Sequence, residues 1–261
     1  MIHVGGVPDW VPAGQLLGPA FRREEGGWMA ELPRSAEADV AARLRGISLG
    51  GGPLAVTVDP PLPRALVRAA RERDARARRD TTPGFSRSGV RLDDEGRWSL
   101  TPEELALALG KEAGGQPVID ATAGCGGNAI GFARAGCAVT AIDRDPVRLA
   151  LARHNAALYG VSIRFLVGDA ATLIPTMPPA LVFVDPPWGR DWSKAGSGLE
   201  QLPLLPALLP LCRAGWWAKV PPSFDPAELL GCTPIAWFGT AAGDVHRVKF
   251  LVLKCDAAAA L

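Results

Sequence analysis

The chain has 261 residues, of which 48% are hydrophobic, enough for one large domain, or one medium domain plus a small one, with a packed core. Its formal net charge of +1 excludes an overall electrostatic attraction to nucleic acid, so any such contact must come from a local patch. We expect no signal peptide and no membrane span, because no long apolar run is present. The five cysteines are widely spaced, which indicates reduced thiols in a cytoplasmic protein and no metal site.

The N-terminal part of the chain predicts a small accessory region. Residues 1–63 are rich in glycine and proline, and only a helix over 35–45 and a strand over 54–58 are expected there. The next segment, 64–79, carries seven arginines, and helical spacing places one group of them on one side: Arg64, Arg68, Arg71, Arg78 and Arg79. Such a stripe suits phosphates, and it equally suits an ordinary solvated face. We assign residues 1–80 to the accessory region and 81–261 to the main domain.

The segment after residue 80 carries turn and helix signals. Residues 89–92 and 97–100 flank turn-forming residues at 93–96, which predicts a hairpin. Thr101-Pro102-Glu103-Glu104 follows as a capping box with proline at the first helical position, and it predicts a helix to about Glu112.

From Val118 onward, short apolar runs alternate with helical segments. The last two strands are joined by a loop too short for a helical crossover, so we expect them to pair antiparallel. The order predicts an α/β fold with a doubly wound, mostly parallel sheet and an antiparallel C-terminal strand, typical of class I (Rossmann-like) methyltransferases. The strands are expected at 118–121, 138–143, 163–167, 181–185, 216–220, 234–238 and 248–254, and the helices at 128–135 and 146–159.

A glycine-rich loop between the first of these strands and the next helix predicts a cofactor site. Gly124 and Gly126 allow close approach of the backbone to a ligand, and Asp143 ends the following strand, where it suits ribose hydroxyls. The same spacing fits a nicotinamide dinucleotide. Asp120, suited to a methionine ammonium, and Asp169, suited to an adenine amine, favour S-adenosylmethionine.

The strand at 181–185 ends in Asp185-Pro186-Pro187-Trp188, which places a carboxylate, a backbone carbonyl and a flat ring near one point. Asp185 and the Pro186 carbonyl are suited to accept the two hydrogens of a nucleobase amine, while Trp188 stacks on the base. An ordinary Pro-Pro turn is the alternative, and the upstream cofactor loop argues against it. Trp192 either lines the same pocket or packs its own loop.

From about Phe85 onward the chain resembles the RNA cap guanine-N2 methyltransferases, the trimethylguanosine synthase family. The matching pieces are Phe85-Ser86-Arg87, the segments 89–93 and 98–103, the glycine loop from Asp120 to Asn128, the segments 141–146, 150–156 and 159–160, Gly168-Asp169 and 186–189. The resemblance implies that Asp120, Gly124, Asp143 and Asp169 hold S-adenosylmethionine near Thr101 and Pro102, with Trp188 stacked on guanine.

Two departures from that family keep the substrate open. Asp185 stands where the eukaryotic cap enzymes carry serine, and residues 1–80 have no counterpart. The usage of alanine, arginine, glycine and proline is typical of a GC-rich bacterial genome, so guanine in an RNA other than a cap is the favoured substrate. Phe85 and Arg87 are candidate substrate contacts, although Arg87 equally suits a surface position.

The alternative functions are an amino methyltransferase acting on adenine, cytosine or a protein glutamine, and a non-catalytic module that binds S-adenosylmethionine or another nucleotide.

Overall fold

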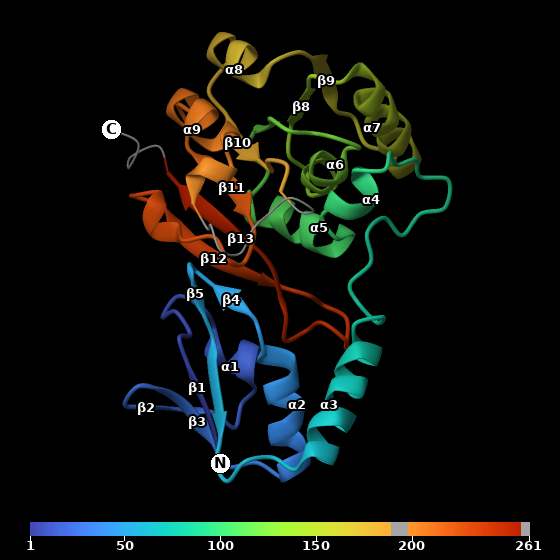
Figure 1. Ribbon diagram of the computed structural model, residues 1–261. Helices are drawn as coiled ribbons and strands as arrows, with labels where there is room; N and C mark the ends of the chain where they lie inside the picture. The colour runs from blue at the N-terminus through green and yellow to red at the C-terminus, as the bar shows by residue number, and fades with distance from the viewer. Residues whose placement is uncertain (189–197, 257–261) are drawn as a thin grey trace. The chain divides into compact units, whose positions relative to one another are not determined.

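The computed structural model describes residues 1–188 and 198–256 (Figure 1). Internal contacts divide the chain into two compact units. The first unit comprises Met1–Thr82, Pro221–Ala227 and Ile235–Leu251, and the second comprises Pro83–Val220, Glu228–Pro234 and Val252–Leu261. Within the described ranges, the helices are too short or too polar to cross a bilayer.

The first unit is built on a four-stranded antiparallel sheet in the order β2-β3-β1-β6. Ile2 and Val4 alternate into its core, where they meet Leu16 and Leu44. The strands are β1 (Ile2–Gly5), β2 (Arg22–Glu24), β3 (Gly27–Ala30), β4 (Ser48–Leu49), β5 (Gly52–Pro53) and β6 (Ala55–Val58), and the helices are α1 (Ala13–Leu17), α2 (Arg34–Leu44) and α3 (Arg64–Ala77).

The helix expected at 35–45 and the strand at 54–58 are confirmed as α2 and β6. The arginine-rich segment at 64–79 is helical as α3, which ends at Ala77, so Arg78 and Arg79 of the expected stripe lie beyond the helix. Strands β1 to β3 were not predicted, because each has only three or four residues and two of them include polar or charged positions.

The second unit contains the predicted parallel sheet. The chain's larger sheet has the strand order β12-β13-β11-β10-β7-β8-β9, and the pairs from β11 to β9 are all parallel. Its strands are β7 (Val118–Asp120), β8 (Val139–Asp143), β9 (Arg164–Val167), β10 (Leu181–Val184), β11 (Trp216–Val220), β12 (Thr233–Phe238) and β13 (Val248–Cys255). Each predicted strand is confirmed to within one or two residues.

Helices cover both faces of this parallel sheet, with α5, α6 and α7 on one side and α8 and α9 on the other (Figure 1). The helices are α4 (Gly96–Ser99), α5 (Glu103–Glu112), α6 (Gly127–Arg134), α7 (Pro146–Tyr159), α8 (Ala170–Leu173) and α9 (Leu204–Leu208), with 3-10 turns at Ile174–Thr176, Leu199–Gln201, Leu209–Leu211 and Pro226–Glu228. The doubly wound fold is therefore confirmed.

Helix α7 shows why the sequence signals located these elements so closely. Asp145 occupies the N-cap, and its carboxylate accepts the backbone N–H of Val147 at 2.7 Å, with Pro146 at the first helical position. Gly160 ends the helix in the left-handed conformation, at φ 66°.

Strands β12 and β13 are joined by a short loop, as expected. The N–H of Gly239 donates to the Arg247 carbonyl at 3.1 Å and closes the hairpin.

The hairpin predicted over 89–100 is wrong. The Asp93 carboxylate accepts the backbone N–H of Gly96 at 2.6 Å, and this turn starts the short helix α4 in place of a strand. The predicted capping box is also wrong, because Pro102 is the N-cap of α5 and Thr101 is a buried side chain with a different partner. Helix α5 itself is confirmed.

Candidate functional site

The acidic residues predicted at strand ends lie along one edge of the parallel sheet. Asp120 is the last residue of β7, Asp143 is the last of β8, and Asp185 directly follows β10. Chain order reverses between β7 and β10, which makes this edge the topological switch point of the sheet. Ligands of open α/β sheets bind at such a point, so the fold brings these predicted residues to the place where a site is expected.

The glycine loop is shaped by close contacts. Gly126 adopts φ 90° as the N-cap of α6, and an added Cβ there would lie 3.1 Å from the Ala152 Cβ. The N–H of Gly124, which has φ 50°, donates to Asp143 Oδ2 at 2.8 Å. Asp143 therefore holds the loop in place, in addition to its predicted role toward ribose.

Asp120 is the most unusual carboxylate of the site. Its side chain is fully buried; Oδ1 accepts the N–H of Thr122 at 3.3 Å, and Oδ2 has no hydrogen-bond partner among the described residues. Burial, and then the nearby charges of Asp185 and Asp143, raise the pKa of Asp120 to about 7. An unpaired buried carboxylate is costly, and a cationic group from a ligand would satisfy it.

Asp169 has partners for both carboxylate oxygens. It is the N-cap of α8, with Oδ1 accepting the Ala171 N–H at 3.0 Å, and its Oδ2 accepts from Arg144 at 2.8 Å. The hydrogen bond from Arg144 lowers the pKa of Asp169. The contact with adenine that we expected stays a prediction.

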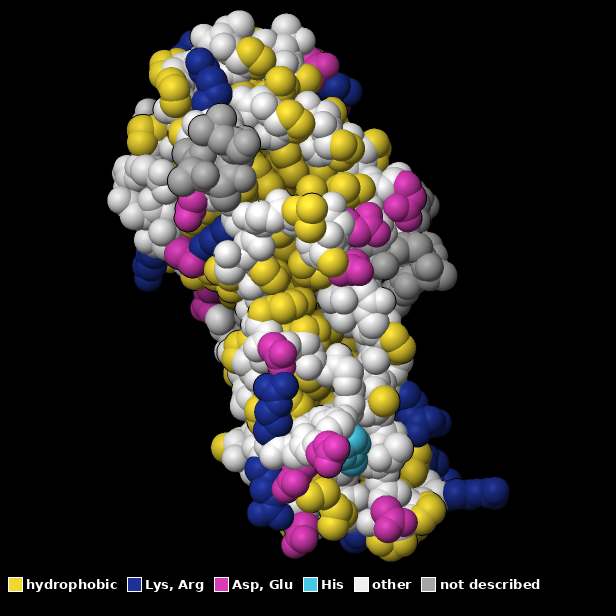
Figure 2. All heavy atoms as spheres, turned by 90° about the vertical axis from the view of Figure 1, so that its left-hand side faces the viewer, with side chains coloured by type: hydrophobic (Ala, Val, Ile, Leu, Met, Phe, Trp, Pro, Cys, Tyr) yellow, Lys and Arg dark blue, Asp and Glu magenta, His cyan; other side chains and the backbone are white. Residues whose placement is uncertain are grey.

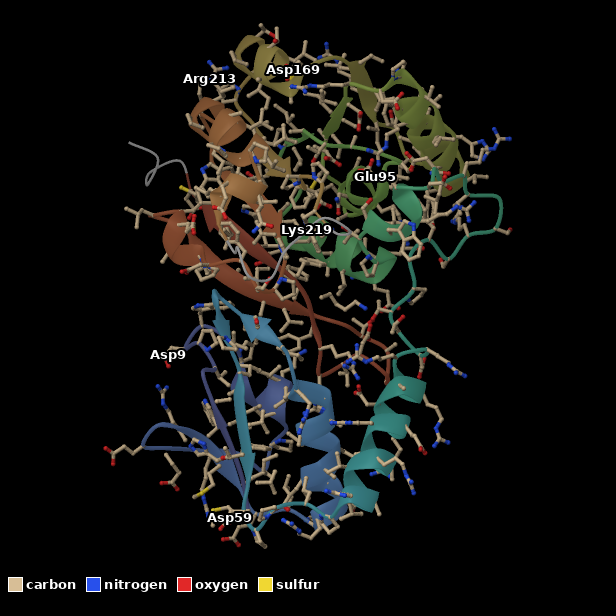
Figure 3. The ribbon with its side chains drawn as sticks, in the orientation of Figure 1. Asp9, Asp59, Glu95, Asp169, Arg213 and Lys219 are labelled. Atoms are coloured by element: carbon tan, nitrogen blue, oxygen red, sulfur yellow. The ribbon has the colours of Figure 1, made fainter. Side chains whose placement is uncertain are left out.

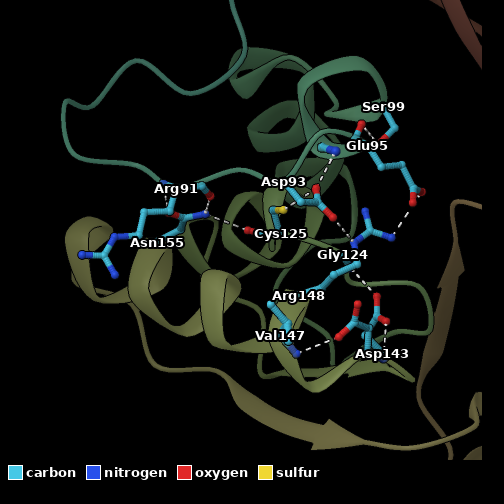
Figure 4. A network of polar contacts seen from close by, with 12 residues as sticks. Arg91, Asp93, Glu95, Ser99, Gly124, Cys125, Asp143, Val147, Arg148 and Asn155 are labelled. Atoms are coloured by element: carbon cyan, nitrogen blue, oxygen red, sulfur yellow. Dashed lines mark hydrogen bonds and ion pairs between the residues drawn. The ribbon is translucent and has the colours of Figure 1, made fainter.

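A polar network joins α7 to the segment before α4 (Figure 4). The Arg148 guanidinium lies 2.9 Å from an Asp93 oxygen and 3.2 Å from a Glu95 oxygen, while the Cys125 thiol donates to Asp93 at 3.3 Å. Asn155 donates to the Cys125 carbonyl at 3.0 Å. These contacts fix the segment at 93–96 against the cofactor loop, which explains why the expected hairpin is replaced.

The Asp-Pro-Pro-Trp corner is contacted by Lys219 of β11, a residue that the sequence did not single out. Asp185 Oδ2 accepts hydrogen bonds from Lys219 Nζ at 2.8 Å and from Asn128 Nδ2 at 3.0 Å. Lys219 Nζ also donates to Thr101 Oγ1 at 2.8 Å and lies 5.3 Å from the centroid of the Trp188 ring. Thr101, Asp185 and Trp188 are thus brought together through Lys219, whose one sequence signal is a lysine inside an apolar strand.

Phe85 and Arg87 contact an aromatic residue of α7. The Phe85 ring centroid lies 5.5 Å from that of Tyr159, and the Arg87 guanidinium lies 4.9 Å from it. Arg87 also donates to the Leu158 carbonyl. Their predicted role toward substrate is untested, and Trp192 lies outside the described residues.

Glu103 links the Phe85-Ser86-Arg87 segment to helices α5, α6 and α7. Its carboxylate accepts hydrogen bonds from the Tyr159 hydroxyl, the Ser86 N–H and Arg134, each at 2.6 Å. Burial acts to raise the pKa of Glu103, but these hydrogen bonds outweigh it and lower the pKa to about 2. Glu103 therefore ties the segment before α4 to α5 and α7.

The strand order and the glycine loop after β7 define a class I methyltransferase fold. Residues 115–196 match the family model described as RNA cap guanine-N2 methyltransferase. That match runs from the strand before the glycine loop through the Asp-Pro-Pro-Trp corner. Among the described residues, no group of three or more His, Cys, Asp or Glu side chains is arranged to hold a metal ion.

Individual relatives agree with this class. The chain is 38% identical over 144 residues to trimethylguanosine synthase from Schizosaccharomyces pombe, covering 50% of this chain and 56% of that protein. It is 29% identical over 157 residues to ribosomal RNA small subunit methyltransferase J from Aeromonas salmonicida, covering 46% of this chain and 63% of that protein. The chain thus spans less than two thirds of these curated relatives.

Among solved structures, a candidate methyltransferase from Porphyromonas gingivalis W83 shares the fold at a TM-score of 0.50 and 22% identity, covering 85% of this chain and 57% of that one.

Proposed function

We propose that the protein is an S-adenosylmethionine-dependent RNA methyltransferase that acts on the exocyclic N2 amine of guanine. The observation that carries this proposal is the Asp185 to Trp188 corner, placed at the switch point beside the buried carboxylate of Asp120. The family match over residues 115–196 supports the same reaction class.

The residues around the glycine loop fit the methyl donor. Asp120 offers an unpartnered buried oxygen for the methionine ammonium, and the left-handed glycines leave room for close approach of the backbone. Asp143 and Asp169 lie at the ends of the next two strands, on the side proposed for ribose and adenine. S-adenosylmethionine, when bound, supplies an electrophilic methyl group carried on a sulfonium.

The proposed catalytic role of the corner is to orient the amine. The lone pair of a guanine amine is delocalised into the ring, which makes the nitrogen a poor nucleophile. Acceptors that draw its two hydrogens out of the ring plane direct the lone pair at the methyl group. Asp185 and the Pro186 carbonyl each accept one hydrogen, and Trp188 holds the base plane, a contact worth about 1 to 3 kcal/mol. With the methyl group transferred as its carbon–sulfur bond breaks, Asp185 would stabilise the positive charge on the amine nitrogen and would accept the released proton.

Asp185 also supports a second candidate function. A carboxylate in this motif is usual among amino methyltransferases of adenine, cytosine and protein glutamine, and its oxygens suit any of these amines. Trp188 favours guanine over that group, because the resemblance to guanine-N2 enzymes includes Trp at this position.

The proposed contact of the first unit with RNA is one face of α3. Arg64, Arg68 and Arg71 are exposed there and have no ion-pair partner among the described residues, whereas Arg73 and Arg76 are paired with carboxylates. On the face of the molecule drawn in Figure 2, basic and acidic side chains are interspersed, which agrees with the net charge of +1. An unpaired arginine row is suited to phosphates.

We also propose a cytoplasmic location, since the five cysteines are free thiols.

The experiment that tests this function is nucleoside analysis by mass spectrometry of RNA incubated with the protein and methyl-labelled cofactor. We expect the label in N2-methylguanosine. Label confined to methyladenosine, methylcytidine or protein would favour the second candidate function. No transfer to any acceptor would indicate a non-catalytic module that binds the cofactor.

A further inference from the structure

Lys219 is a buried lysine near the carboxyl end of β11, where its charge needs a compensating partner. It lies on β11, whose five residues are all buried, and its own exposed fraction is 3%. An ammonium removed from water is costly unless it is paired and hydrogen-bonded, so its partners account for its presence. Lys219 is labelled in Figure 3.

The register of the sheet brings Lys219 level with Asp185. Val184 of β10 pairs with Ala218 of the parallel strand β11, so the next residue on each strand is Asp185 and Lys219. Their ion pair measures 2.8 Å between Lys219 Nζ and Asp185 Oδ2. The pairing is therefore fixed by two neighbouring strands and not by flexible loops.

The two oxygens of the Asp185 carboxylate differ in their hydrogen-bond partners. Oδ2 accepts from both Lys219 and Asn128, and the Asp185 backbone N–H donates to Thr122 Oγ1 at 2.8 Å. Oδ1 accepts no hydrogen bond from another described residue. This arrangement locks the carboxylate plane and leaves Oδ1 for a hydrogen of the substrate amine.

The same ammonium also supports the aromatic ring. It lies 5.3 Å from the Trp188 ring centroid, within the range of a cation–π interaction. A cation held over one face of the ring leaves stacking of a base to the other face. One side chain therefore sets both elements of the proposed recognition, the acceptor and the stacking surface.

We propose that Lys219 is a positioning residue for methyl transfer: it orients Asp185 and the Trp188 ring without touching the substrate. This role rests on the proposed function. It predicts that Lys219 acts through Asp185, so replacing both residues should cost little more than replacing Asp185 alone.

The test is a double-variant cycle with Lys219→Met, Asp185→Asn and the combination, measured as kcat and KM for RNA methylation. We expect Lys219→Met to lower kcat about 10- to 100-fold, as loss of orientation does. In the Asp185→Asn background the same change should lower kcat less than about threefold, because the oriented group is already impaired.

Folding is checked by cofactor affinity and the thermal unfolding midpoint, with Lys219→Gln as a second variant that keeps a hydrogen-bond donor without the charge. We expect the affinity of each single variant for cofactor to stay within about threefold of wild type, since, among the described residues, Lys219 meets those expected near the cofactor only through its hydrogen bond to the Thr101 hydroxyl. Full additivity of the two kcat losses, or loss of cofactor binding in both Lys219 variants, would overturn the positioning role alone. Absence of wild-type transfer to guanine would overturn the proposed function and this role with it.

Discussion

The sheet edge of the second unit and the arginine face of α3 place charge in opposite ways. At the sheet edge a few charged groups are buried and share specific hydrogen bonds, as Lys219 does with Asp185. On α3 the unpaired arginines are exposed and repeat at helical spacing. Removing one partner of a buried ion pair leaves an uncompensated charge, so a single substitution should have a large effect on activity. Exposed charges are screened by salt, so their effect on RNA affinity should depend on how many are present.

The largest effect is expected at the sheet edge. Asp185→Ala removes the acceptor that orients the amine, and kcat should fall about 10²- to 10⁴-fold while the cofactor still binds. Steady-state methylation assays with labelled cofactor measure this fall. Asp9→Ala is the matched control, because Asp9 is an exposed carboxylate of the first unit. Wild-type turnover in Asp185→Ala would remove Asp185 from the mechanism.

A smaller effect is expected for Asp120, the carboxylate proposed to bind the cofactor. Asp120→Asn removes the charge that is proposed to pair with the methionine ammonium, and cofactor affinity should weaken by about 1.5 to 3 kcal/mol. Because the pKa of Asp120 is raised to about 7, wild-type affinity should rise with pH through that value as the carboxylate ionises.

Calorimetry across this pH range tests the cofactor prediction. The Asn variant should lose the part of the pH dependence that comes from Asp120. An unchanged affinity and an unchanged pH profile would contradict the assignment of Asp120 to the cofactor.

Glu103 is expected to contribute to the stability of the second unit. Glu103→Gln weakens three hydrogen bonds to a mostly buried carboxylate, and we expect the free energy of unfolding to fall by about 1 to 3 kcal/mol. The pKa of this group is lowered in the folded protein, so its stabilisation is complete above 4.5 and is lost as pH falls toward 2.

Chemical denaturation at neutral and acidic pH measures this contribution, with the exposed Glu25→Gln as control. A loss of stability that is the same in Glu25→Gln, or that does not shrink at acidic pH, would show that the network around Glu103 contributes nothing specific.

The smallest effect per residue is expected on α3. Arg68→Ala with Arg71→Ala removes two unpaired cations, and the slope of log affinity against log salt should become shallower by about 1.4 to 1.8 for RNA. Arg73→Ala with Arg76→Ala removes equal charge from the paired positions and should change the slope less. RNA-binding titrations at several salt concentrations compare the two; equal slopes would make the arginine row an ordinary solvated face.

The parallel sheet was predictable because its signals are local. Buried strands such as β10 read as continuous apolar runs, and Asp145, Pro146 and Gly160 define both ends of α7. The acidic strand ends could be selected for the same reason, since parallel strands finish at a shared edge.

The missed features depend on contacts between distant residues. The turn formers at 93–96 suit a hairpin, and only the bonds from Gly96, Cys125 and Arg148 to Asp93 show why a helix forms there. Lys219 reaches Thr101 across 118 positions of sequence. A lysine within Trp-Trp-Ala-Lys-Val was a visible signal, but its partners could not be read from spacing.

The most direct test of the central claim uses two RNAs that differ only at the N2 amine. The wild-type protein is incubated with labelled cofactor and either guanosine-containing RNA or the same RNA transcribed with inosine, which lacks that amine. We predict transfer to the first RNA, none to the second, and little to either with Asp185→Ala. Equal labelling of the inosine RNA by the wild-type protein would contradict methylation of guanine N2.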